Sequence, residues 1–277
     1  AEHIGDYLEE ASYKLISGLA RRRNARGSGS VASKSIRQDT DRSVKVDGGI
    51  GPVDWTMEQF RRLGKSQEEA GLTIGEQASA AMLKDYINTS AMAVRAAIER
   101  QTELVHDATA GKISLPALNR GASKFGDRSQ SLACWMMHGT TWHDLIDEAI
   151  QNTNRLFNIG DINVMEDKLG RRYVVTDSPA LMTAGSPDTY HTLGLVPGAV
   201  QVQTGALISV TKENTGGENI TVTHQGEYNF MLGLLGYSWN SENGGASPSD
   251  AALASGASWD LFASSLKDTA GVLVKSQ

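Results

Sequence analysis

Apolar residues recur at helical spacing in three stretches of the chain, each of which predicts an amphipathic helix, and a further helix is expected to stop at Gly139. These helices are expected over residues 4–20, 73–106, 124–138 and 142–151. The second has capping-box spacing, because Glu76 follows Thr73 by three residues and each can satisfy an orphan amide. At 1.5 Å per residue, its roughly 33 residues would reach about 50 Å. So long a helix with one apolar stripe is typical of a strut laid across a sheet.

Alternation of apolar and polar residues predicts two hairpins in the second half of the chain. Residues 162–165 and 173–176 are expected to pair as a tight hairpin through a polar turn that ends at Gly170. Residues 206–224 are expected to form another hairpin around a turn rich in Asn and Gly.

The C-terminal part adds one more strand and one more helix. The mostly apolar run 228–239 predicts a buried strand. Ser247 and Pro248 are suited to the N-cap and first position of a short helix that ends at Ala254. Helices and strands together indicate the α+β class.

Residues 21–51 hold too few large apolar side chains to bury a core. Residues 43–47 alternate, and glycines follow at 48, 49 and 51. The segment is therefore expected to be an extended two-stranded arm that contact with something else keeps ordered. The glycines lack both the Gly-x-Gly-x-x-Gly spacing and a following Gly-Lys-Ser/Thr, which favours a flexible loop tip over a phosphate-binding loop.

Charge is distributed unevenly along the chain. The formal net charge is −6, yet residues 21–45 contain eight Lys/Arg and two Asp, a local charge of +6. An acidic chain is not built as a whole to coat nucleic acid. The basic segment has no aromatic residue for base stacking, so contacts with acidic surfaces of neighbouring subunits are favoured, and phosphate binding stays open as the alternative. The candidate inter-subunit residues are Arg21, Arg22, Arg23, Arg26, Lys34, Arg37, Arg42 and Lys45.

The sequence contains no recognisable catalytic, metal or cofactor site. His138 and His143 are five residues apart and lack the i, i+4 spacing of a helical zinc site. Cys134 is the only cysteine and sits among apolar neighbours, where a buried hydrophobe is the default. No Gly-x-Ser-x-Gly elbow occurs. No apolar run approaches the 18 or more residues of a membrane span.

Five segments together resemble the major capsid proteins of tailed bacteriophages. They are LNRGASKFGDRSQSLACWMMHGTTWHDL (118–145), LGRRYVVTDSPAL (169–181), YHTLGLVPGAVQVQ (190–203), NFMLGLLGYSW (229–239) and ASPSDAALASGASWDLF (246–262). The likeness covers about residues 70–277. It lies in the order and character of the segments, and no single motif would suffice for it.

The resemblance implies the phage major capsid fold (the Johnson fold), which encapsulins and the floor of herpesvirus capsids share. The domains that it implies are an N-terminal arm (1–30), an extended loop (31–57), a peripheral domain with a long spine helix (58–115), an axial domain (116–204), a return to the peripheral sheet (205–240) and a C-terminal part of the axial domain (241–277).

The function that the resemblance implies is structural, without an enzymatic activity or a cofactor. Subunits would assemble as pentamers and hexamers into an icosahedral head around double-stranded DNA, which they would contact without sequence specificity. Neighbouring capsomers and scaffold, portal and decoration proteins are the implied partners, and a membrane is not. The implied location is the virion, after assembly in the cytoplasm of the bacterial host. The alternatives are an encapsulin-like nanocompartment shell and a nucleic-acid-binding protein that uses residues 21–45.

Overall fold

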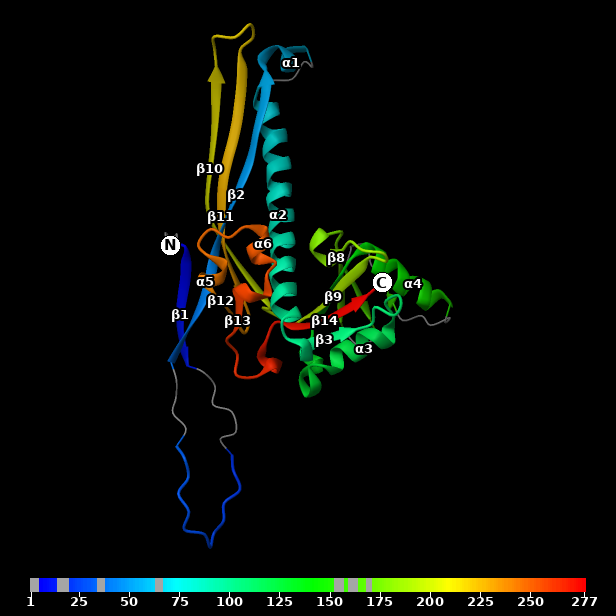
Figure 1. The fold of residues 1–277 in the computed structure, drawn as a ribbon. Helices are drawn as coiled ribbons and strands as arrows, with labels where there is room; N and C mark the ends of the chain where they lie inside the picture. Colours follow the sequence, from blue (N-terminus) through cyan, green and yellow to red (C-terminus); the bar gives the residue numbers. More distant parts are fainter. Residues whose placement is uncertain are drawn as a thin grey trace.

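The computed structural model describes residues 5–13, 20–33, 38–62, 67–151, 157–158, 164–167 and 171–277, which form two sheets with packed helices (Figure 1). The first sheet contains β1 (Tyr7–Tyr13), β2 (Gln38–Thr56), β10 (Val200–Asn214), β11 (Thr221–Leu234), β12 (Tyr237–Trp239) and β13 (Trp259–Leu261). The second contains β3 (Val105–Asp107), β4 (Cys134–Met137), β5 (Phe157–Asn158), β6 (Val164–Asp167), β7 (Arg172–Val175), β8 (Met182–Thr183), β9 (Thr189–Leu195) and β14 (Gly271–Ser276).

Six α-helices and five 3₁₀ turns connect these strands in the described part of the chain. The helices are α1 (Met57–Arg62), α2 (Gln67–Glu99), α3 (Leu115–Ser123), α4 (Gly139–Gln151), α5 (Ser241–Gly244) and α6 (Asp250–Leu253). The 3₁₀ turns are η1 (Thr102–Leu104), η2 (Gly126–Ser131), η3 (Pro179–Leu181), η4 (Gly256–Ser258) and η5 (Leu266–Asp268).

The first sheet extends far beyond its own base. β2 pairs antiparallel with β1 through residues 38–44 and with β11 through residues 44–56, and β10 pairs with the other side of β11. Because β1 pairs only with the first part of β2, the remainder of β2 continues with β11 and β10 as a long three-stranded extension beside α2 (Figure 1). We call this extension, with the first part of α2, the blade; it comprises residues 45–62, 67–90 and 200–227.

Aromatic side chains join α2 to the blade strands. The Tyr228 hydroxyl donates a hydrogen bond to the Asp85 carboxylate over 2.7 Å. The Tyr86 ring meets Tyr228 and Phe230 edge-on, with centroids 5.9 and 4.6 Å apart. On β2, Gly48 lies directly opposite Tyr228, and a Cβ there would come within 2.3 Å of the tyrosine ring. A glycine is therefore required where the ring crosses the neighbouring strand.

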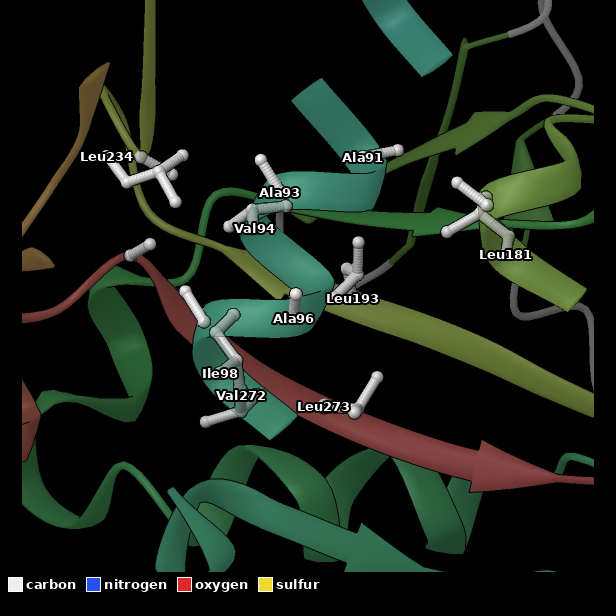
Figure 2. Packing of buried hydrophobic residues seen from close by; sticks show 14 of the residues in the cluster. Ala91, Ala93, Val94, Ala96, Ile98, Leu181, Leu193, Leu234, Val272 and Leu273 are labelled. Atoms are coloured by element: carbon white, nitrogen blue, oxygen red, sulfur yellow. The ribbon is translucent and has the colours of Figure 1, made fainter. Parts of the chain in front are cut away.

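The last turns of α2 enter the main hydrophobic core. Ala91, Ala93, Val94 and Ala96 lie on turns of the helix that face residues from both sheets, among them Leu193 and Leu234 (Figure 2). The alanines let the helix backbone approach these strands closely. The apolar stripe predicted along the whole of this helix is therefore buried only in its last turns. Val94 is buried, whereas Leu83 is 61% exposed.

The second sheet forms the other half of the molecule. β14, near the C-terminus, lies between β3, to which it is parallel, and β9, to which it is antiparallel. α3 packs on β14 so closely that a Cβ on Gly121 would come within 2.3 Å of Val274. On the neighbouring strands Trp135 and Tyr173 are fully buried, and the Trp142 ring of α4 lies 5.4 Å from Tyr173. The core thus spans the sheet and its helices.

Several predictions from the sequence are confirmed. The α+β class and the first hairpin are present, because β6 and β7 pair antiparallel with Met165 opposite Tyr173. Its turn, residues 168–170, lies outside the described residues. The hairpin predicted over 206–224 also exists and is longer, since β10 pairs with β11 from Val200 to Asn214. α4 has the predicted amphipathic pattern and begins two residues before Thr141.

Two predicted helices are wrong. Residues 7–13 of the expected N-terminal helix form β1, where pairing with β2 satisfies the backbone; residues 14–19 of that helix lie outside the described part. Residues 134–137 of the expected third helix form β4, between β7 and β9, after the 3₁₀ turn η2. A short apolar run looks the same in a buried strand and in a buried helix, so tertiary pairing decided both cases.

Boundaries of the long helix were also misplaced. α2 begins at Gln67, and Thr73 is inside it, where its hydroxyl donates to the Glu69 carbonyl. The helix ends at Glu99 instead of continuing to residue 106, because the chain turns there to form β3.

Turn residues misled the prediction at three places. Gly48, predicted in a loop tip, is inside β2. The run 228–239 is not one strand, because Gly236 adopts a positive φ of 80° and separates β11 from β12. The cap of α6 is Ser249 and not Ser247, and the Ser249 hydroxyl accepts a hydrogen bond from the Ala252 amide.

Candidate assembly surfaces

The first candidate surface is a basic segment, residues 20–33. All residues from 20 to 33 are exposed, and the segment lies away from both sheets (Figure 1). Its internal order comes from Asn24, whose side chain accepts the Arg26 amide over 3.0 Å. Arg21, Arg22, Arg23 and Arg26 give the segment a charge of +4, with no acidic residue in it.

The other four candidate residues are distributed differently. Lys34 and Arg37 lie outside the described residues. Arg42 is bound within its own chain, because its guanidinium pairs with Glu9 at 2.6 Å. Lys45 is only partly exposed and lies 3.9 Å from Asp47. The structure thus groups the four arginines of residues 20–33 as a free cationic surface and places Arg42 and Lys45 in the sheet.

The second candidate surface is the blade, whose net charge is opposite in sign to that of the basic segment. Its described side chains include nine carboxylates and four Lys/Arg, a net charge of −5. The carboxylates are Asp47, Asp54, Glu58, Glu69, Glu76, Asp85, Glu213, Glu218 and Glu227. Since opposite surface charges attract through water over about one Debye length, roughly 8 Å at physiological salt, the two surfaces are electrostatically complementary.

The blade also carries most of the exposed large apolar side chains. Ten of the thirteen among the described residues are on it: Val53, Met57, Leu72, Leu83, Ile87, Val202, Leu207, Ile208, Val210 and Ile220. So many exposed large apolar side chains on one part of a subunit indicate a surface for protein association.

The sheet face turned away from α2 is hollowed. Tyr228 points toward α2, so its neighbour Glu227 and the paired Ile208 point to the opposite face. Two adjoining hollows of about 370 and 450 Å³ share these two side chains. The first is also lined by Lys45 and Asp47, and the second by Val210 and Lys212. Ile208 and Val210 thus give the face an apolar floor, with charges of both signs beside it.

The described residues offer no grouping suited to catalysis or metal binding. No cluster of three His, Cys, Asp or Glu side chains is positioned for a metal ion in the described ranges. Burial raises the pKa of the Cys134 thiol, which keeps it protonated and unreactive. His138 bonds to Thr140 within its own turn. Among the helices of the described segments, none is long and apolar enough to cross a membrane.

The sequence matches the family described as "Major capsid protein 13-like" over residues 1–273. The chain belongs to this Gp13-like family of major capsid proteins. It is therefore a structural protein of a bacteriophage capsid shell, located in the virion, and not an enzyme. Its partners include further copies of itself in the capsid lattice. No curated protein sequence matches.

Solved phage structures share the fold at low sequence identity. The chain is similar to that of Mycobacterium phage Adephagia, with a TM-score of 0.58 and 9% identity over 99% of this chain and 85% of that one. It is also similar to Cyanophage Pam1, from a capsid asymmetric unit, with a TM-score of 0.57 and 10% identity over 99% and 85%. The capsid of Myoviridae phage XM1 gives 0.52 and 11% over 99% and 86%. These likenesses confirm the predicted Johnson fold.

The apolar and acidic blade escaped prediction as an assembly surface. The sequence contained a signal for it. In the strand predicted over Ala206 to Val210, the successive residues Leu207 and Ile208 place an apolar side chain on each face. A strand that presents apolar residues on both faces normally indicates burial on both. Only the sheet order shows that β10 is at an edge and that its chain provides no cover for it.

Proposed function

We propose that this major capsid protein assembles as pentamers and hexamers into an icosahedral head that encloses double-stranded DNA. Heterologous contacts between identical subunits produce closed rings when the rotation closes. The blade supports this proposal, because ten of its large apolar side chains are exposed among the described residues. The likeness to phage shells favours this reading over a nanocompartment.

The sequence-derived domains are proposed for the same assembly. With the bounds that the resemblance implied, the peripheral domain (58–115 with 205–240) would contain α2, β11 and most of β10. The axial domain (116–204 with 241–277) would contain α4 and most strands of the second sheet near the capsomer centre. Residues 7–13 pair with residues 38–44, so the arm and the extended loop would share one paired base. Scaffold, portal and decoration proteins remain proposed partners, and the bacterial cytoplasm is the proposed place of assembly.

We further propose a contact between the charged surfaces of two neighbouring subunits. The four arginines of residues 20–33 would lie on the acidic blade of a neighbouring subunit. Charge complementarity supports this contact. The segment is also fully exposed, so its arginines are accessible to a neighbouring subunit. The apolar floor around Ile208 would lie under the same contact. Electrostatic attraction would then orient subunits, and apolar burial would hold them.

The test replaces Arg21, Arg22, Arg23 and Arg26 together by glutamine and follows shell assembly by light scattering. We expect slower assembly that loses most of its dependence on salt, because exposed charge pairs are screened by ions. The matched control replaces by glutamine four exposed positive charges off the blade: Lys112, Arg120, Lys124 and Arg172. It should assemble close to the wild-type rate.

The same variant distinguishes the subunit contact from binding of nucleic acid. If the variant assembles normally but no longer retains DNA in a filter-binding assay at low salt, the arginines bind phosphate and the proposed contact is wrong. If assembly is lost and DNA retention is unchanged, the contact is supported.

A further inference from the structure

Arg42 forms contacts with three separate elements. Across the β1–β2 pair it lies directly opposite Glu9, and its Nη2 and Nε atoms are 2.6 and 2.9 Å from the Glu9 carboxylate. Its Nη1 donates to the Ser241 hydroxyl of α5 over 2.7 Å. Its backbone amide donates to the Ser238 hydroxyl of β12 over 3.0 Å. The Tyr7 ring of β1 lies 5.3 Å from the guanidinium carbon.

The partners of Arg42 on β12 and α5 belong to a well-fixed platform. Trp239 and Trp259 pack edge-to-face with centroids 4.8 Å apart, and both are buried. Asn240 caps α5 by accepting the amides of residues 242 and 243, and its own amide donates to Asp260 over 2.7 Å. The platform therefore holds Ser238 and Ser241 in place independently of the β1–β2 pair.

The β1–β2 pair also reaches the body through β2 itself, which pairs with β11 from Val44 to Thr56, whereas residues 38–43 have a register partner in β1 only. Within the pair, the Lys45 amide of β2 donates to the carbonyl of Asp6, the residue before β1, over 2.9 Å. Residues 20–33, which carry the four arginines, lie between β1 and β2 in the chain. Because the segment is connected at both ends to this pair, we expect a change in the angle of the pair to the platform to move the segment.

We infer that Arg42 is a positioning residue for assembly, and not an inter-subunit contact: it fixes the β1–β2 pair on the β12–α5 platform and so aims the basic segment at the neighbouring subunit. This inference rests on the proposed function. Only an arginine fits the role, because its planar fork can bond Glu9 and Ser241 at once. A lysine carries the same charge at one atom and can satisfy only one of the two well.

The direct test measures, in dissociated subunits, how far the basic segment lies from the platform. Spin labels at Ser28→Cys and Ala246→Cys, in a Cys134→Ser background, report the distance from the basic segment to the platform. We expect one narrow distance distribution with Arg42, and a broad one with Arg42→Ala or Arg42→Lys. A narrow distribution of unchanged mean in Arg42→Ala would overturn the inference.

A second measurement connects position to assembly. Arg42→Ala and Arg42→Lys should assemble about tenfold more slowly than the wild type, the change that a modest loss of orienting free energy produces. Their subunit melting temperatures should change little. The control is Arg120→Ala, which removes an exposed cation of α3 that lies off the blade. Assembly of Arg42→Lys at the wild-type rate would contradict the inference.

These outcomes remain separate from the proposed function. If wild-type subunits form no shells, the proposed function fails, while the distance measurement still decides whether Arg42 positions the segment. If wild-type shells form and both Arg42 variants assemble normally, only the positioning role is lost. Ser241→Ala gives a milder variant, which should broaden the distance distribution without removing a charge.

Discussion

Glu99 at the end of α2 accepts a hydrogen bond from Lys275 of β14 over 2.5 Å. The same carboxylate lies 3.6 Å from Arg95, and Arg95 donates to the Ala180 carbonyl over 2.6 Å. Burial acts to raise the pKa of Glu99, but the bond and charge of Lys275, together with His191 and Arg95, outweigh it and hold that pKa below its ordinary value. One carboxylate therefore joins the long helix to the C-terminal strand.

Replacing Glu99 by glutamine should destabilise the subunit. The change leaves Lys275 and Arg95 half-buried without their counter-charge, and we expect a loss of about 1–3 kcal/mol. Urea unfolding of dissociated subunits measures it. The matched control is Glu58→Gln, whose pair with Arg62 is exposed on α1 and should contribute less than about 0.5 kcal/mol. Equal effects of the two changes would show that the Glu99 contact has no special weight.

Because His191 is buried, we expect the folded subunit to lose stability in acid. Its side chain is 3% exposed, and its Nε2 lies 2.9 Å from the Thr183 hydroxyl. Burial first, and then the charge of Arg95, lowers its pKa to about 4, with Lys275 acting the same way and Glu99 opposing. Because the folded pKa lies below the unfolded value, this stability is full above about pH 6.5 and is lost as pH falls toward 4.

The magnitude follows from the shift. A change from 6.5 to about 4 corresponds to about 3 kcal/mol lost across that window. His191→Gln can still bond Thr183 but does not titrate. Urea unfolding at pH 7 and pH 4.5 should therefore show a smaller acid loss in the variant than in the wild type. Parallel curves for both proteins would rule out the role of this histidine.

Two adjacent glycines give a paired test of the blade. A Cβ on Gly48 would come within 2.3 Å of the Tyr228 ring, whereas a Cβ on Gly49 would meet nothing nearer than 4.0 Å. Gly48→Ala should therefore cost about 1–3 kcal/mol through overpacking. Gly49→Ala should be neutral or slightly stabilising. Thermal unfolding distinguishes them, and equal melting temperatures would contradict the observed packing.

The exposed apolar residues of the blade should matter for assembly and not for folding. Ile208→Ser and Val210→Ser change side chains that are 58% and 59% exposed, so subunit stability should change by less than about 0.5 kcal/mol. Assembly should be strongly reduced, because these side chains are buried by a neighbour in our proposal. Leu261→Ser, at an exposed site off the blade, is the control. Normal assembly of both blade variants would remove the blade from the interface.

Local patterns predicted the fold where pattern and tertiary context agree. The stripe around Val94 and the alternation of β10 and β11 each identify an element correctly. The pattern failed at Cys134 to Met137, where four apolar residues without period fit a helix as well as a strand. At Gly48 the sequence showed flexibility, but the cause is an aromatic ring on the next strand, which is 180 residues away in the chain.

The candidate assembly surfaces were predicted only in part, because the sequence shows local patterns but not contacts between distant residues. Four exposed arginines follow directly from a basic stretch without apolar neighbours. The role of Arg42 depends on Ser238 and Ser241, about 200 residues later, and no local signal joins them. The blade required knowledge of which strand is at the sheet edge.

The most direct test of the shell function is negative-stain electron microscopy of the native protein, with light scattering for particle mass. Closed icosahedral particles, built from many copies and with five- and six-fold capsomers on their surface, are the predicted result. A monodisperse monomer or dimer, with residues 20–33 intact, would contradict the account.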